Sequence, residues 1–350
     1  MASLLIYGAY GYSGRLIAEE ARSKGLRPIL AGRNPQKLSL MAQELDLSYQ
    51  VLDLEETERL EELLGEVEVV LHCAGPFAYT AEKMIQACLA TQTHYLDITG
   101  EVEVFEMAAT YDEQAKEAGI MVLPGVGFDV VPTDCMALYL KKKMPEAERL
   151  ELAFHGSGEL SHGTANTAID NLGKGGMIRE AGKLKKVPLA HATKSIMFEE
   201  KELSTMSIPW GDVSTAWHST QIPNITVYVA QPTRTIRMMK ASRYLTPILS
   251  SNPIRQYLKK QVAKMPAGPS PQTRSRARSV VVGEVRGPDG EIRKARVKVE
   301  DGYTFTAKAS INVVRRVLMD QFKPGFQTPA LAFGESLVCK ISETRFVDFV

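Results

Sequence analysis

SLLIYGAYGYSG, residues 3–14, is the stretch that decides the fold of this chain. An apolar run predicts a strand over 3–7, and three glycines follow it directly, in a GxxGxxG spacing that varies the commoner GxGxxG. Such a turn needs glycine at the tight bend, at the backbone that approaches a pyrophosphate, and where helix meets strand. The next helix then offers free N–H groups to phosphates. The dinucleotide-binding residues predicted here are Gly8, Tyr10, Gly11, Tyr12, Ser13 and Gly14.

The first 125 residues continue this pattern by alternating short apolar runs with longer amphipathic segments. Alternation of this kind indicates βαβ units and a parallel sheet. Six strands and five crossovers make a complete doubly wound, Rossmann-type domain over 1–128. The expected strands cover 3–7, 27–31, 48–52, 67–72, 94–98 and 120–124, and the expected helices lie near 13–24, 35–45, 56–64, 79–91 and 102–118.

The pattern changes after Gly127. A helix near 132–143, strands at 149–155 and 225–230, and a hairpin turning at Pro288-Asp289-Gly290 predict a second, α+β domain with a mostly antiparallel sheet over 129–322. The segment 323–350 is expected to return to the first domain as a loop and a helix. Residues 266–279, PAGPSPQTRSRARS, are typical of a mobile loop.

The composition is that of an ordinary globular chain, with 350 residues, 44% hydrophobic, 24% charged and a formal net charge of +1. These values exclude a disordered chain and give no overall preference for nucleic acid. No apolar run approaches the roughly 18 residues of a spanning helix, and no signal peptide is expected. Four scattered cysteines without a CxxC pair or a histidine cluster predict reduced thiols, no metal and a cytoplasmic location.

Charge is unevenly distributed along the chain. Residues 213–283, here called the basic segment, hold no Asp or Glu and eleven Lys or Arg. Such a field would attract a phosphorylated substrate, an acidic protein or an anionic membrane surface. The alternative is a pair of solvated helices whose charges are balanced by acidic neighbours in space.

The end of the second expected strand bears on the choice of cofactor. An NAD site places Asp or Glu there to bind the ribose 2′-hydroxyl, whereas this strand ends in Arg33-Asn34 with no acid. Arg33 would pair with a 2′-phosphate, assisted by Lys37, which favours NADP(H). Asp53 ends the third strand, where it would touch the adenine or cap the next helix.

Two further strands end in groups suited to the nicotinamide half of the cofactor. The small residues Ala74, Gly75 and Pro76 follow the fourth strand and leave room for a ligand across the strand tips, although an ordinary Gly-Pro turn explains them too. Asp97 and Glu101 follow at the fifth strand. They are candidate acid–base groups, and helix capping is the alternative, favoured for Glu101.

A series of short motifs is spread along nearly the whole chain. In chain order they are GAYGYSG, AGRN, CAGPF, YLDITGE, GFDVVPTD (127–134), HGTANT (162–167) and QTPALAFG (327–334). By these motifs the chain resembles the saccharopine dehydrogenase-like oxidoreductases, most closely the branch with trans-acting enoyl reductases of polyketide and lipid assembly. The resemblance implies a Rossmann domain, a substrate domain inserted before the C-terminal helix, and NADPH as hydride donor. It further implies that the segments around Gly127-Phe128-Asp129 and Ser161-His162-Gly163-Thr164 border the active site.

Asp129 and His162 are therefore the candidate catalytic residues, against the alternatives of a helix cap and a hydrogen-bonded structural histidine. Histidine titrates near neutrality, which suits a proton donor. Three functions stay open. The first is an NADPH-dependent enoyl reductase whose acyl substrate is free or carried by an acidic protein. The second is an imine reductase or amino-acid dehydrogenase, which predicts a compact pocket charged by Arg179, Lys174 or Arg234. The third is a non-enzymatic NADP-binding protein at a lipid surface. Pairing of two copies is also left open.

Overall fold

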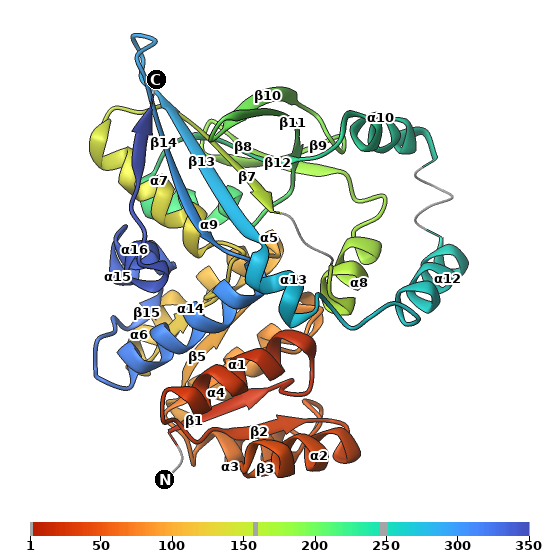
Figure 1. Ribbon diagram of the computed structural model, residues 1–350. Coiled ribbons are helices and arrows are strands. Elements are labelled where there is room, and N and C mark those ends of the chain that lie inside the picture. The colour runs from red at the N-terminus through yellow and green to blue at the C-terminus, as the bar shows by residue number, and fades with distance from the viewer. Residues whose placement is uncertain (1–2, 157–159, 246–250, 350) are drawn as a thin grey trace. The chain divides into compact units, whose positions relative to one another are not determined.

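The computed structural model describes residues 3–156, 160–245 and 251–349, which form two compact units (Figure 1). Unit 1 comprises Met1–Val131 and Tyr303–Ala332, and unit 2 comprises Pro132–Gly302 and Phe333–Val350. These boundaries differ from the predicted 1–128, 129–322 and 323–350. The chain returns to unit 1 about twenty residues earlier than expected, and its last residues lie in unit 2.

Unit 1 is built on a sheet of seven parallel strands in the order β15-β6-β5-β4-β1-β2-β3. Its central strands are continuous apolar runs because helices cover both faces. The strands are β1 (Leu4–Tyr7), β2 (Ile29–Gly32), β3 (Tyr49–Val51), β4 (Val69–His72), β5 (His94–Asp97), β6 (Met121–Leu123) and β15 (Gly325–Phe326). The helices are α1 (Tyr12–Ser23), α2 (Pro35–Leu45), α3 (Thr57–Leu64), η1 (Phe77–Tyr79), α4 (Ala81–Thr91), α5 (Val102–Ala109), α6 (Asp112–Glu117) and α14 (Gly302–Val317).

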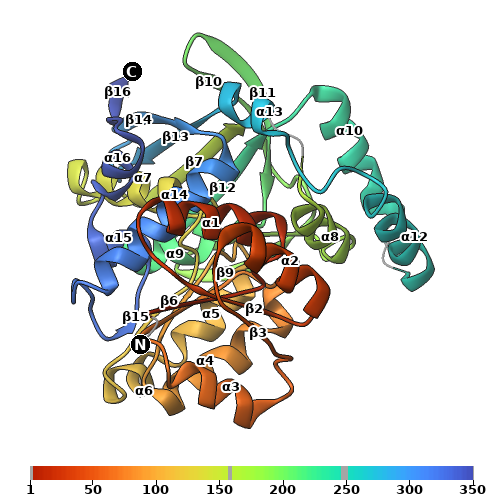
Figure 2. The same cartoon turned by 60° about the horizontal axis from the view of Figure 1, so that its bottom comes forward.

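The core of unit 1 lies on both sides of this sheet. Leu5, Val70 and Tyr95 point to the face covered by α3, α4 and α5, where they pack with Leu60, Met84 and other buried side chains. Figures 1 and 2 show α1, α2 and α14 on the opposite face. The carboxyl ends of β1, β2, β4 and β5 therefore meet at one edge, where ligands bind in such sheets.

Two predictions for unit 1 were wrong in detail. The helix expected over 102–118 is divided into α5 and α6, and Asp112 begins the second piece. The Asp112 carboxylate accepts the Phe326 N–H at 2.8 Å, which ties α6 to β15. The segment around Gly325 was expected to be a loop, but it adds a seventh strand beside β6.

Unit 2 is built on a nine-stranded mixed sheet whose main order is β10-β11-β12-β7-β13-β14-β16, with β8 joined to β12 and β9 to β8. Only β12 and β7 pair in parallel; the other described pairs are antiparallel. The predicted hairpin at 288–290 is confirmed. The strands are β7 (Arg149–Gly156), β8 (Gly176–Glu180), β9 (Lys183–Val187), β10 (Thr193–Phe198), β11 (Lys201–Ile208), β12 (Asn224–Ala230), β13 (Arg278–Arg286), β14 (Ile292–Glu300) and β16 (Val347–Phe349).

The pairing of β16 with β14 explains why the C-terminal segment belongs to unit 2 and does not return to unit 1 as expected. The segment expected to be a loop over 266–279 contains α13, capped by Ser270, whose hydroxyl accepts the Thr273 N–H at 3.1 Å. The helices that lie wholly or mainly in unit 2 are α7 (Val131–Lys143), α8 (His162–Asp170), α9 (Asp212–Thr220), α10 (Thr233–Ser242), η2 (Arg243–Leu245), α12 (Asn252–Val262), α13 (Pro271–Arg276) and α16 (Leu337–Ser342), whereas α15 (Pro329–Phe333) lies mainly in unit 1.

The fold class predicted from the sequence is confirmed: a Rossmann-type parallel sheet and a second α+β unit whose sheet is mostly antiparallel. Among the described residues, no helix combines the length and the apolar character that crossing a bilayer requires. The same residues contain no group of three or more His, Cys, Asp or Glu side chains arranged to hold a metal ion.

Candidate functional site

The turn between β1 and α1 has the geometry of a phosphate-binding loop. Gly8 has φ +82°, and a Cβ there would lie 2.8 Å from the Cβ of Ala74, so only glycine allows the β1 and β4 loops to approach. A Cβ at Gly14 would lie 2.5 Å from the Gly8 carbonyl oxygen. Gly11 precedes α1 without a side-chain cap. The first N–H groups of α1, which includes Ser13, are thus presented to an anion.

The two tyrosines of this loop pack against neighbouring elements of unit 1. A Cβ at Gly32 would lie 2.7 Å from Cε1 of Tyr10, so this ring covers the end of β2. The Lys37 Nζ lies 5.6 Å from the centre of the same ring. Tyr12 meets Tyr303 of α14 edge to face, with ring centres 5.0 Å apart. The loop is therefore held between α2 and α14.

Arg33 and Lys37 form a cationic corner beside Tyr10. Both side chains are exposed, and neither has an ion pair within the described ranges. Asn34 has a structural task, because its Oδ1 accepts the Lys37 N–H at 2.9 Å and caps α2. The cap fixes the first turn of α2, and this places both cations at the carboxyl end of β2.

Asp53 does not cap α3, which was the alternative to an adenine contact, because the N-cap residue is Glu56 and no side chain caps the helix. Its Oδ1 accepts the Glu55 N–H at 3.1 Å, while Glu56 Oε1 accepts the Asp53 N–H at 3.0 Å. These bonds shape the turn before α3. A contact of Asp53 with the cofactor stays a prediction.

Glu101 holds the loop that contains Ala74, Gly75 and Pro76. Its two carboxylate oxygens accept the N–H groups of Phe77 at 3.0 Å and Ala78 at 2.9 Å, the first residues of η1. The peptide bond between Gly75 and Pro76 is cis. Glu101 precedes α5 without capping it by its side chain. Its carboxylate thus joins the tips of β4 and β5, a structural task different from either one predicted for it.

Asp97 is a buried anchor of the same edge. Its Oδ2 accepts the Tyr95 hydroxyl at 2.6 Å, and its Oδ1 accepts the N–H groups of Thr99 and Gly125 at 2.9 and 2.8 Å. Burial raises the pKa of this carboxyl to about 6, despite these three donors. Because both oxygens are engaged inside the protein, the contacts support a structural role for Asp97 more than an acid–base role.

Asp129 lies in the loop after β6 and packs against the loop after β5, and its surroundings differ from those of Asp97. Its carboxyl makes no hydrogen bond or ion pair with any described residue, and burial raises its pKa to about 7. It packs against Gly100, where a Cβ would lie 3.0 Å from the Asp129 Cβ and 3.1 Å from its Oδ2. An isolated carboxyl with a raised pKa can hold and release a proton near neutral pH.

Backbone strain accompanies this position. Val130, the next residue, is buried and has φ +145°, a region that β-branched residues avoid. The preceding Phe128 N–H donates to the Thr306 hydroxyl of α14 at 2.9 Å. Asp129 is thus fixed from both sides. Sequence reasoning missed Gly100, Tyr303 and Thr306, and only the helical spacing of Phe305, Ala309 and Val313 signalled that α14 exists.

His162 belongs to unit 2, at the start of α8. Its ring Nε2 lies 2.8 Å from the Met265 carbonyl oxygen, and its backbone N–H donates to the Ala267 carbonyl at 3.1 Å. Ser161 caps the helix by accepting the Thr164 N–H. These contacts give His162 the structural role that was its alternative, and its catalytic role stays a prediction.

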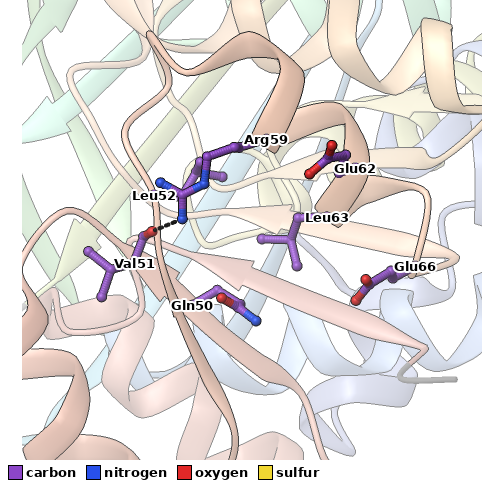
Figure 3. Close-up of a pocket in the computed structure, with 7 residues that line it drawn as sticks. All are labelled: Gln50, Val51, Leu52, Arg59, Glu62, Leu63 and Glu66. Carbon is purple, nitrogen blue, oxygen red and sulfur yellow. Dashed lines mark hydrogen bonds between the residues drawn. The ribbon is translucent and has the colours of Figure 1, made fainter.

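A pocket of unit 1 lies apart from these residues, beside the edge strand β3 (Figure 3). The Arg59 guanidinium crosses it and donates to the Val51 carbonyl oxygen at 3.1 Å. None of the predicted site residues lines it. Its lining residues are Gln50, Val51, Leu52, Arg59, Glu62, Leu63 and Glu66.

Comparison with known proteins extends this description. Among curated relatives, the saccharopine dehydrogenase-like oxidoreductase of Mus musculus is 28% identical over 239 residues, which cover 59% of this chain and 56% of that protein. The trans-acting enoyl reductase of Mycobacterium ulcerans strain Agy99 is 31% identical over 158 residues, or 43% and 38% of the two chains. The chain spans about half the length of the first curated relatives that it matches.

A solved structure supports the fold. The apo saccharopine dehydrogenase (L-Glu forming) of Saccharomyces cerevisiae has a TM-score of 0.68 at 12% identity and covers 100% of both chains. Residues 4–123 match the family model described as the saccharopine dehydrogenase NADP binding domain. These are the residues that form β1 to β6 and their glycine-rich turn. Over this domain, the chain is similar to the saccharopine dehydrogenase-like oxidoreductases.

Proposed function

We propose that the protein is an NADPH-dependent reductase that reduces the activated C=C bond of an acyl or polyketide-type substrate. The choice of NADPH as the cofactor rests on one observation, the exposed cations Arg33 and Lys37 at the end of β2. A 2′-phosphate is the group that a guanidinium at this strand end would recognise, whereas a free ribose hydroxyl calls for an acid.

The residues present fit the cofactor. The Gly8–Gly14 turn and the start of α1 would hold the pyrophosphate, Arg33 and Lys37 the 2′-phosphate, and the Ala74–Pro76 loop would leave room for the nicotinamide. Bound there, NADPH would supply the hydride. The contribution of the chain is to orient it and to manage one proton.

Asp129 supports the proton transfer. Reduction of an enoyl group adds hydride to the β-carbon and a proton to the α-carbon. With a pKa of about 7, the Asp129 carboxyl is protonated in a large share of molecules at neutral pH, and no described residue competes for its proton. We assign it as the acid that protonates the α-carbon, with water restoring its proton afterwards.

The substrate class rests on the similarity to a trans-acting enoyl reductase, which is partial. The second candidate is imine reduction, because an ionised Asp129 would attract an iminium. Arg179, one of the charged residues expected to line a compact amino-acid pocket, is instead hydrogen-bonded to the backbone of its own unit. Its guanidinium donates to the carbonyl oxygens of Val213 and Gly182 at 2.8 and 2.9 Å. This engagement favours the acyl substrate.

The cofactor assignment is tested by titrating the protein with NADPH and NADH while following cofactor fluorescence. Arg33→Ala should weaken NADPH binding by about 10- to 100-fold, the worth of a charge-assisted contact, and leave NADH within about twofold. Arg22→Ala, which removes an exposed arginine of α1, is the matched control. Equal affinity of the wild type for both cofactors would contradict the assignment.

The reaction is tested by supplying NADPH with α,β-unsaturated acyl thioesters, free or linked to a carrier protein, and in parallel with imines. Asp129→Asn should lower kcat by about 100-fold or more while leaving the NADPH Kd unchanged, because the change removes a proton and little volume. Turnover of imines alone would favour the second candidate. NADPH binding without turnover of any substrate would favour a non-enzymatic NADP-binding protein.

A further inference from the structure

The helices α10 and α12 of unit 2 carry exposed apolar side chains that their own unit does not cover. Met238 is 64% exposed, Tyr244 in η2 is 89% exposed and Tyr257 is 62% exposed. Met265, just after α12, is 52% exposed. Single exposed apolar side chains are common on protein surfaces, but several large ones on neighbouring helices are typical of an interaction site.

The same surface carries cations as well. Arg234 and Arg237 on α10, Lys260 on α12 and Lys264 just after α12 are exposed and have no ion pair among the residues that the structure describes. In this part of the chain, the basic segment forms one ion pair, between Lys259 and Asp170 at 2.6 Å. Within the described ranges, acidic neighbours therefore balance Lys259 and none of these four cations.

Other members of the basic segment attach the helices to unit 2. The Arg243 guanidinium donates to the carbonyl oxygens of Leu189 and Ala190, both at 2.6 Å, and Arg255 donates to that of Leu172 at 2.9 Å. Ile236 and Val262 are the buried side chains of α10 and α12. The remaining cations and the exposed apolar side chains thus lie on the outward faces. Figures 1 and 2 show the two helices on the same side of unit 2.

We propose that the outward faces of α10 and α12 bind the surface of an anionic lipid bilayer. Unpaired Lys and Arg would meet the headgroup phosphates, while Met and Tyr would enter the boundary between headgroups and acyl chains, where tyrosine is favoured. An acidic protein would use the cations but would not require four exposed apolar side chains among them. This surface binds lipid independently of the reaction proposed for unit 1.

The test is sedimentation of the full-length protein with vesicles of phosphatidylcholine, with and without an equal part of phosphatidylglycerol. Binding should require phosphatidylglycerol and should weaken from about 0.1 M to about 1 M salt, as the Debye length falls from about 10 Å to about 3 Å. The double variant R237E/K260E should bind at least about tenfold more weakly, since each surface cation contributes about fivefold. M238S/Y257S should also weaken binding, and its residual binding should stay salt-sensitive.

Matched controls lie elsewhere on the protein. Lys340→Glu with Arg345→Glu makes the same charge change at two exposed residues, one in α16 and one shortly after it. Figure 1 shows α16 on the side of unit 2 away from α10 and α12. Met319→Ser removes a methionine that is 56% exposed in unit 1. Both should bind vesicles like the wild type, and all variants should keep the wild-type Tm and NADPH Kd. Equal loss in the controls, no binding to anionic vesicles, or capture by polyglutamate without binding to vesicles would overturn the proposal.

Discussion

Replacing Asp129 by asparagine should change how the stability of the protein depends on pH, and this test needs no substrate. Burial raises the pKa of the carboxyl from 3.8 to about 7. Each pKa unit corresponds to about 1.4 kcal/mol, so the full shift corresponds to about 4 kcal/mol. The side chain keeps some solvent access, which reduces the expected effect to about 2 kcal/mol.

The sign follows from proton binding. Between about pH 4 and pH 7 the folded state holds a proton on Asp129 that the unfolded state has released. The free energy of unfolding of the wild type therefore falls as the pH rises through this window. The amide of the Asp129→Asn variant cannot ionise, so this residue no longer lowers the free energy of unfolding as the pH rises. The free energy of unfolding of the variant minus that of the wild type should therefore be about 2 kcal/mol larger above pH 7 than at pH 4.

Urea denaturation of both proteins at a series of pH values measures this difference. The contribution of Asp97 is the same in both proteins and cancels. Glu58→Gln, at an exposed carboxylate of α3, is the control for the loss of a surface carboxylate. If the stability difference between Asp129→Asn and the wild type did not change with pH, the role of Asp129 as a proton donor near neutral pH would lose its physical basis.

Three further outcomes are expected. The kcat/KM of the reductase should fall above about pH 7, where Asp129 loses its proton, and a pH profile of initial rates measures this. Gly8→Ala should abolish NADPH binding, measured by cofactor fluorescence, because its Cβ would lie 2.8 Å from that of Ala74. Glu101→Gln should lower the free energy of unfolding in urea by about 1–3 kcal/mol, because an amide supplies one acceptor oxygen where η1 has two N–H donors.

Local patterns were sufficient to predict much of unit 1. The strands β1, β2, β4 and β6 are mainly apolar and fully buried, and the glycine spacing after β1 reflects close contacts that no other residue allows. Arg33 was recognised because its place at the end of β2 and the lack of an acid are both visible in the sequence. These features depend on residues that are near one another along the chain.

The features that were not predicted depend on distant partners. Thr306 accepts a hydrogen bond from Phe128 across 178 residues, and nothing near either residue indicates it. Glu101 was predicted to act as an acid–base group or to cap the helix that follows it. Its carboxylate oxygens instead accept N–H groups of η1, from residues 24 and 23 positions earlier in the chain. Asp129 was identified by its motif, but its isolation and raised pKa depend on the packing around it.

The path of the chain between the two units has a consequence for biosynthesis. Unit 1 needs α14 and β15, which follow about 170 residues of unit 2, so a fragment ending at Val131 lacks the ring that packs on Tyr12 and one of the two partner strands of β6. On the ribosome, the nucleotide-binding half must wait for nearly the entire polypeptide before it can close. The exposed β6 edge and unfilled helix face would meanwhile favour aggregation. We therefore expect refolding in which unit 1 gains full protease resistance only together with residues 303–332.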